Sequence, residues 1–262
     1  MKPLLATLII LVGSGLVIAQ HQSPQNTSCY STHTFGAGAN KFTFCISNTG
    51  TLINLESPAS FKQLGVLEGY ILCGGQTVYA YDAGNDFLTW SSLDYQQPNG
   101  PNTLPLTIIG RTVRGEFQVT QTFEATPEEK SVRITVAVKN ISGVGISNLK
   151  FARYFDADLS NDSGDDIFDT DADSVWGRDS GSGAGHHGLL LTALSLLQSH
   201  TVAVEKRSDW YPLTTPGTAA TCSPLPQASP TAPGNYVGRL TYNLGTINTG
   251  VTKIVKLVYR RI

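Results

Sequence analysis

The chain has 262 residues and a formal net charge of −2 at pH 7, with 40% hydrophobic and 15% charged residues. This hydrophobic share allows a sizeable core, whereas 26 glycines and few charges are typical of a strand-and-turn protein and not of a helical one. The sequence contains no basic stripe, which argues against nucleic-acid binding.

Residues 1–19 have the layout of a secretory signal peptide. Lys2 gives a charged start, an apolar stretch follows, and Val17-Ile18-Ala19 places small or β-branched residues before Gln20. The alternative is an uncleaved membrane anchor, because the apolar stretch approaches the length of a membrane span. Cleavage predicts a secreted protein, extracellular or periplasmic, with no membrane attachment afterwards.

Residues 20–40 are polar and glycine-rich and predict a flexible N-terminal arm, followed by a single domain over residues 41–262. Two early strand pairs are expected, at 41–47 with 51–57 and at 69–73 with 77–82. Residues 83–104 are rich in Asn, Asp, Gln, Pro and Gly and predict a long loop.

Four cysteines follow the signal peptide: Cys29, Cys45, Cys73 and Cys222. An even number in an exported chain predicts two disulfides, and three connectivities are possible. We favour Cys45 with Cys73, because both belong to the same early block of strands, and Cys29 with Cys222. No pair has the close spacing of a zinc site.

The middle and end of the chain also predict strands. Val132, Ile134, Val136 and Val138 alternate with more polar residues, a period of two that indicates a half-buried strand. Leu189–Leu197 and Thr201–Lys206 predict a hairpin, although leucine and alanine make a helix a competitor for the first segment. Further strands are expected at 106–112, 117–125, 146–156, 174–176, 236–244 and 251–260.

About a dozen strands and no convincing amphipathic helix predict an all-β protein, a large antiparallel β-sandwich. A propeller would require repeated blades, which the sequence does not show.

Eight aspartates crowd into the stretch from Asp156 to Asp173. Carboxylates this dense require a compensating charge or full solvation, and Ca²⁺ is the hard cation that oxygen ligands at alternate positions favour. The alternatives are a solvated acidic loop and catalytic carboxylates. The candidate Ca²⁺ ligands are Asp156, Asp158, Ser160, Asp162, Asp165, Asp169, Asp171 and Asp173.

Several aromatic and histidine residues are candidate ligand contacts. Sugar rings stack on exposed aromatic side chains, although most large aromatic residues are buried in packing. A histidine pair in a glycine-rich loop is a candidate acid–base or ligand group, or simply part of a loop. The candidates are Trp90, Trp176, Trp210, Tyr211, His186 and His187.

Three segments carry a family resemblance, namely 118–123, 132–142 and 149–158. Their order, with an Asn-x-Ser turn and a strand that carries Arg before Asp-x-Asp, resembles the β-supersandwich of galactose mutarotase-like domains. The resemblance implies a supersandwich-like fold and an extracellular domain that faces carbohydrate. Family mutarotases use a histidine and a carboxylate, but His186 and His187 lie in a different setting and no glutamate matches.

We therefore expect a secreted, non-catalytic protein that binds carbohydrate and is stabilised by Ca²⁺. The alternatives are a sugar-active enzyme (a mutarotase or epimerase, a lyase or a hydrolase) and a purely structural extracellular domain.

Overall fold

The computed structural model describes residues 29–58, 68–75, 77–82, 90–157, 159, 166–180, 187–209 and 232–262. These residues form sixteen strands in three antiparallel sheets, together with two 3₁₀ turns at Gly38–Asn40 and Pro127–Glu129. The predicted all-β class is confirmed. No helix in the described ranges is long and apolar enough to cross a membrane. The predicted signal peptide, residues 1–19, lies outside them.

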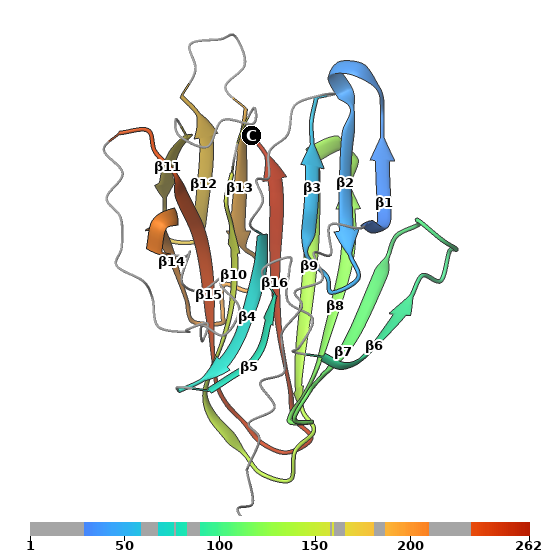
Figure 1. Cartoon of the computed structure of the whole chain (residues 1–262), viewed down its shortest axis with the longest axis vertical. Coiled ribbons are helices and arrows are strands. Elements are labelled where there is room, and N and C mark those ends of the chain that lie inside the picture. The colour runs from blue at the N-terminus through green and yellow to red at the C-terminus, as the bar shows by residue number, and fades with distance from the viewer. Residues whose placement is uncertain are drawn as a thin grey trace, which may run out of the picture.

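The largest sheet has eight strands in the order β11-β12-β13-β16-β9-β8-β7-β6 (Figure 1). Their bounds are β6 Trp90–Gln96, β7 Leu106–Thr112, β8 Phe117–Thr126, β9 Ser131–Asn140, β11 Asp166–Thr170, β12 Ser174–Asp179, β13 Gly188–Ala193 and β16 Thr252–Arg261.

The second sheet has five strands in the order β14-β15-β10-β4-β5, and the third has three in the order β1-β2-β3. Their bounds are β1 Cys29–Phe35, β2 Phe42–Ser47, β3 Leu52–Glu56, β4 Glu68–Gly74, β5 Thr77–Asp82, β10 Ile146–Phe155, β14 His200–Lys206 and β15 Tyr236–Ile247.

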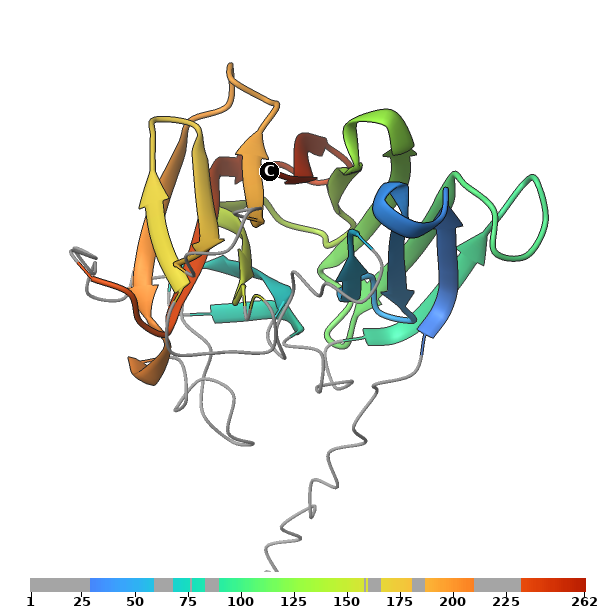
Figure 2. The same cartoon turned by 90° about the horizontal axis from the view of Figure 1, so that it is seen from above.

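The two smaller sheets lie side by side against the curved inner face of the eight-stranded sheet (Figure 2). Phe155 of β10 packs against Phe168 of β11 and edge-on against Tyr259 of β16. On the other half of the large sheet, the β2–β3 turn accepts a hydrogen bond from Gln121 of β8 at the Thr49 carbonyl. The core therefore runs continuously between one large layer and two smaller sheets.

The alternation in β9 explains how this sheet is built. Val132, Ile134, Val136 and Val138 are fully buried, whereas Arg133 and Lys139 are exposed on the opposite face. Successive side chains of a strand point to opposite faces of the sheet, so burying one set leaves the other in solvent.

Three sequence expectations differ from the structure. Residues 29–35, expected within the flexible arm, form β1, whose inward positions carry the polar Ser31 and His33 and so hide the alternation. Trp90, expected in a loop, begins β6. The predicted hairpin is also wrong: β13 pairs with β16 and β14 with β15, so the chain crosses from one layer to the other between them.

The favoured disulfide pairing is wrong as well. Cys29 bonds to Cys45, across the antiparallel pair β1–β2, with a Cα–Cα distance of 5.5 Å. Cys73 is also disulfide-bonded, but it lies on β4 of a different sheet, and its partner is outside the described residues, as is Cys222. Membership of one early block of sequence did not place Cys45 and Cys73 in one sheet.

Candidate functional site: a pocket beside strands β14 and β15

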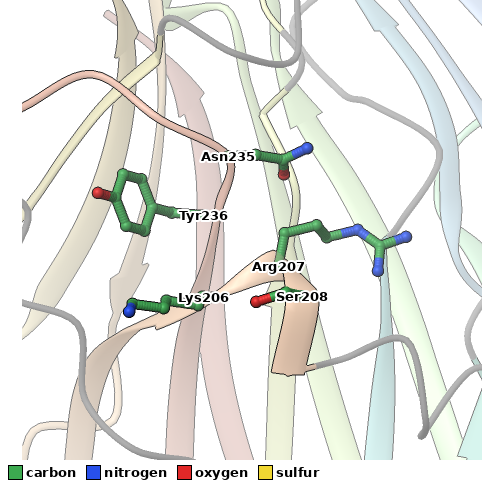
Figure 3. A pocket seen from close by; sticks show the side chains of 5 residues that line it. All are labelled: Lys206, Arg207, Ser208, Asn235 and Tyr236. Atoms are coloured by element: carbon green, nitrogen blue, oxygen red, sulfur yellow. The ribbon is translucent and has the colours of Figure 1, made fainter.

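A pocket of about 310 Å³ opens where β14 ends and β15 begins (Figure 3). Its walls are Lys206, Arg207, Ser208, Asn235 and Tyr236. Lys206 and Tyr236 face each other across the β14–β15 ladder, and the Arg207 N–H donates to the Asn235 carbonyl at 3.1 Å. The two strands thus bring together residues that are about thirty positions apart in the sequence.

Arg207 forms a fixed, neutralised wall of this pocket. Its guanidinium points away from the ends of Lys206 and Tyr236 (Figure 3). Arg207 Nε donates to Asp156 Oδ2 at 2.9 Å, and both side chains are buried. A buried charge requires a partner of this kind, so the ion pair holds the end of β10 beside the end of β14.

Tyr236 supplies a half-buried aromatic surface. Its ring packs edge-on against Phe168, with centroids 6.0 Å apart. Gly234 provides the space for this ring, because a Cβ at position 234 would lie 2.8 Å from Tyr236 Cε2. The pocket therefore combines a rigid ring with an ammonium, a hydroxyl and an amide, a set suited to a small polar ligand that also has an apolar face.

The described aspartates of the predicted Ca²⁺ site do not converge. Asp156 is paired with Arg207, Asp169 Oδ1 accepts the N–H of Thr170, and Asp171 Oδ1 accepts the N–H groups of Asp173 and Ser174. Within the described ranges no three or more His, Cys, Asp or Glu side chains gather in a group that could hold a metal ion. Asp158, Ser160, Asp162 and Asp165 lie outside those ranges.

Asp173 has a partner that the sequence analysis missed. Its Oδ1 lies 3.0 Å from His200 Nε2, and His200 Nδ1 lies 2.9 Å from the Gln198 carbonyl. No spacing rule points to this contact, because it joins the β11–β12 turn to the start of β14 in the other layer.

The predicted aromatic contacts are dispersed. Trp90 Nε1 donates to the Tyr70 hydroxyl at 3.1 Å, and its ring covers Gly110, where an added Cβ would lie 2.5 Å from Trp90 Cε3. Trp176 is half-buried on β12 in the eight-stranded sheet. Trp90 therefore has a packing role, and Trp176 remains available on the sheet surface.

His187 contacts Arg261. Its Nδ1 faces Arg261 Nη2, and burial together with the Arg261 charge lowers the pKa of His187 below its ordinary value. His186, Trp210 and Tyr211 lie outside the described residues.

A second polar cluster is closed to ligands. Arg153 donates to the Glu68 carboxylate through Nε and Nη2. Its Nη1 donates to Gln121 Oε1, and its Nη2 also donates to the Gly50 carbonyl. The Tyr259 hydroxyl donates to Glu68 at 2.8 Å. All of these side chains are buried. Burial alone would lower the pKa of Arg153, but the Glu68 carboxylate outweighs it and raises that pKa. This cluster joins the sheets and is structural.

Sequence comparisons give no relative: no protein-family model matches the chain, and no curated protein matches it either. Solved structures do match. A bacterial glucoamylase complexed with acarbose superposes with a TM-score of 0.57 at 10% identity, covering 91% of this chain. This chain spans about a third of the glucoamylase, covering 33% of it.

Two further structures show weaker likeness. A putative aldose 1-epimerase from Escherichia coli K12 superposes with a TM-score of 0.49 at 10% identity, covering 88% of this chain and 99% of the epimerase. A polysaccharide lyase superposes with a TM-score of 0.40 at 8% identity, covering 89% of this chain and 32% of the lyase. At such identities the likeness concerns the fold alone. The predicted similarity to galactose mutarotase-like supersandwich domains is confirmed.

Proposed function

We propose that this protein is a secreted, non-catalytic carbohydrate-binding domain that holds its ligand in the pocket beside β14 and β15. The observation that carries the proposal is the lining of that pocket. The half-buried Tyr236 ring shares the lining with the side chains of Lys206, Ser208 and Asn235; Tyr236 and Lys206 extend to one side, and the Asn235 amide extends to the other (Figure 3). A sugar ring has an apolar C–H face for the aromatic ring and hydroxyls for the polar groups.

The size of the pocket supports a small ligand. Its volume of about 310 Å³ is at the lower end of the roughly 300–1,000 Å³ that small-molecule sites occupy. The fold, shared with a glucoamylase that was solved with acarbose bound, is compatible with a sugar ligand but does not identify one.

The chemistry of the lining favours binding over turnover. General acid–base chemistry on a sugar requires ionisable groups placed on the reacting bond, commonly a pair of carboxylates. The described lining holds no acid and no histidine. Two carboxylates contact the lining from outside it: Asp156 is bound to Arg207 at 2.9 Å, and Asp209 Oδ1 accepts a hydrogen bond from Ser208 Oγ at 3.4 Å.

Two features support export. The first is the signal-peptide pattern of residues 1–19, and the second is the Cys29–Cys45 disulfide, a bond that persists in oxidising compartments.

Calorimetric titration of residues 20–262 with a panel of neutral and acidic oligosaccharides tests this function. We expect one class of sugar to bind. Asn235→Ala should weaken that binding about tenfold, which corresponds to the loss of one or two hydrogen bonds to the ligand. Tyr236→Phe keeps the stacking ring and should bind nearly as the wild type, whereas Tyr236→Ala should not bind.

Lys139→Ala is the matched control, because this exposed lysine lies on β9, outside the pocket. Thermal unfolding of each variant separates loss of binding from loss of fold. Equal affinity of Asn235→Ala, Tyr236→Ala and wild type would refute the pocket assignment, and turnover of a bound sugar would refute the non-catalytic role.

A further inference from the structure

Three neighbouring cations on the outer face of the eight-stranded sheet form no ion pair with a described residue. Arg133 of β9 and Lys256 and Arg260 of β16 are all exposed. The register pairs Val258 with Arg133, so Arg133 is a diagonal neighbour of both Lys256 and Arg260. Diagonal neighbours on one face lie about 7–8 Å apart, close enough for like charges to repel.

These cations are also unengaged within the described chain. None of the three forms an ion pair or a side-chain hydrogen bond with another described residue. In a protein of net charge −2, three neighbouring cations without a partner among the described residues form a surface that an anionic group would stabilise.

A shallow groove of about 200 Å³ lies between two of these cations. It crosses β9, β16 and β13 and is lined by Arg133, Arg260, Ser131, Thr192, Val258, Leu194 and Glu129. Arginine suits carboxylate and sulfate groups, because its planar N–H fork donates two parallel hydrogen bonds to a pair of oxygens. Ser131 and Thr192 also line the groove, and the Thr192 hydroxyl lies 3.0 Å from Ser174 Oγ.

Two carboxylates border the cations without neutralising them. Glu129 lines the groove, and Glu124 of β8 is the direct cross-strand partner of Arg133. Neither carboxylate forms a salt bridge with a described cation. The groove lining itself carries Arg133 and Arg260 against Glu129, which leaves it with a net positive charge.

An apolar platform continues this face. Trp176 pairs with Leu190, and Leu190 pairs with Arg260, in successive strands of the sheet. Trp176 and Leu190 are half-buried, whereas their neighbours Val175 and Leu191 point into the core. Strands are spaced about 4.8 Å apart, so Trp176 is two spacings, or about 10 Å, from the strand that carries Arg260.

We propose that this outer face binds an acidic oligosaccharide, a second site separate from the Tyr236 pocket. A sugar ring lies over Trp176 and Leu190, and a carboxylate or sulfate of a neighbouring sugar unit is held between Arg133 and Arg260. Arg133, Lys256 and Arg260 form a compact cluster on two neighbouring strands, which suits the spaced charges of an acidic glycan better than the continuous phosphate backbone of a nucleic acid.

The test measures the affinity of residues 20–262 for three oligosaccharides of equal length: oligogalacturonate, sulfated dextran and neutral dextran. We expect one of the two acidic probes to bind more tightly than the neutral one, and the stronger probe identifies the anionic group. Combined Arg133→Ser and Arg260→Ser should weaken that binding about tenfold or more, the size of one charge-assisted hydrogen bond. Trp176→Ala should weaken it as well.

The matched control combines Arg111→Ser with Lys139→Ser, an equal change of charge in another row of the same face. We expect it to bind as the wild type does, and Tyr236→Ala to do the same, which separates this site from the proposed pocket. All replaced arginines and lysines are exposed, so thermal unfolding without ligand should be unchanged.

Four results would overturn the proposal. The first is that neither acidic probe binds, and the second is that neutral dextran binds as tightly as the acidic probes. The third is that the control variant loses as much affinity as the Arg133→Ser, Arg260→Ser variant, and the fourth is that Trp176→Ala binds as tightly as the wild type. If single-stranded DNA binds more tightly than both acidic probes, and the groove substitutions weaken its binding, the face would instead be assigned to nucleic acid.

Discussion

Glu68 and Arg153 form a buried ion pair between strands β4 and β10, with Glu68 Oε1 2.5 Å from Arg153 Nε and Oε2 3.1 Å from Nη2. Neither side chain reaches solvent appreciably. Tyr259 of the eight-stranded sheet donates to the same carboxylate, and the Leu52 N–H of the three-stranded sheet donates to its other oxygen. One carboxylate therefore ties together all three sheets.

Removing either partner of this pair should be strongly destabilising. Glu68→Ala leaves the Arg153 guanidinium buried without its counter-charge, and we expect a loss of about 3–5 kcal/mol in urea unfolding. Combined Glu68→Leu and Arg153→Met should lose less than Glu68→Ala, since no unpaired charge stays buried. Lys41→Met, which breaks the more exposed Lys41–Glu56 pair, should cost under about 1 kcal/mol. Equal losses for Glu68→Ala and Lys41→Met would contradict the role of the cluster.

Two buried tyrosines should make the fold sensitive to alkali. Burial raises the pKa of Tyr242 to about 12, and burial together with the Glu68 charge raises the pKa of Tyr259 well above its ordinary value. In the unfolded chain both groups titrate near pH 10, as tyrosine does ordinarily. Their contribution to stability is therefore complete below about pH 10 and is lost as the pH rises from there through the folded pKa values.

We expect Tm to fall steeply between about pH 10 and pH 12, together with a late rise of phenolate absorbance as the protein unfolds. Tyr242→Phe removes one of the two titrating groups, so its Tm should depend less steeply on pH in this range. A wild-type Tm that is constant across this range would contradict the linkage.

The disulfide pairing can be tested directly. Peptide mapping without reductant should recover Cys29 linked to Cys45, and a Cys45–Cys73 peptide would contradict the structure. Combined Cys29→Ser and Cys45→Ser should cost about 3 kcal/mol, because the bond closes a loop with a sequence separation of 16. The loss of stability should be concentrated in β1, where amide hydrogen exchange should become faster.

Calcium binding by the acidic segment stays a prediction. Asp156 Oδ2 is bound to Arg207 and Asp171 Oδ1 accepts two backbone N–H groups, so Asp158, Ser160, Asp162 and Asp165 are the candidate ligands to test first. We expect millimolar Ca²⁺, but not Mg²⁺, to raise Tm by several degrees relative to EDTA, since saturation at about 100 times Kd adds roughly 2.7 kcal/mol.

Asp158→Asn should remove this Ca²⁺-induced rise, and Asp171→Asn, the matched control, should keep it. The same Tm in EDTA and in Ca²⁺ would show that the segment is a solvated acidic loop.

The sequence by itself determined the class of fold and most of the strands. The alternation of Val132, Ile134, Val136 and Val138 defines a buried and an exposed face with no reference to any partner strand. That information is local, because the direction of a side chain from a strand depends only on its position in the alternation. The same holds for the exposed Arg133 and Lys139, which occupy alternate positions of the same strand.

Only the tertiary structure decided which strands pair and which side chains meet. β13 and β14 are neighbours in sequence but belong to different sheets, and Cys45 bonds to Cys29 instead of Cys73. The pocket shows the same dependence, because Lys206 and Tyr236 meet only through the β14–β15 register. Such contacts depend on packing between segments distant in sequence, which local hydrophobic periodicity does not encode.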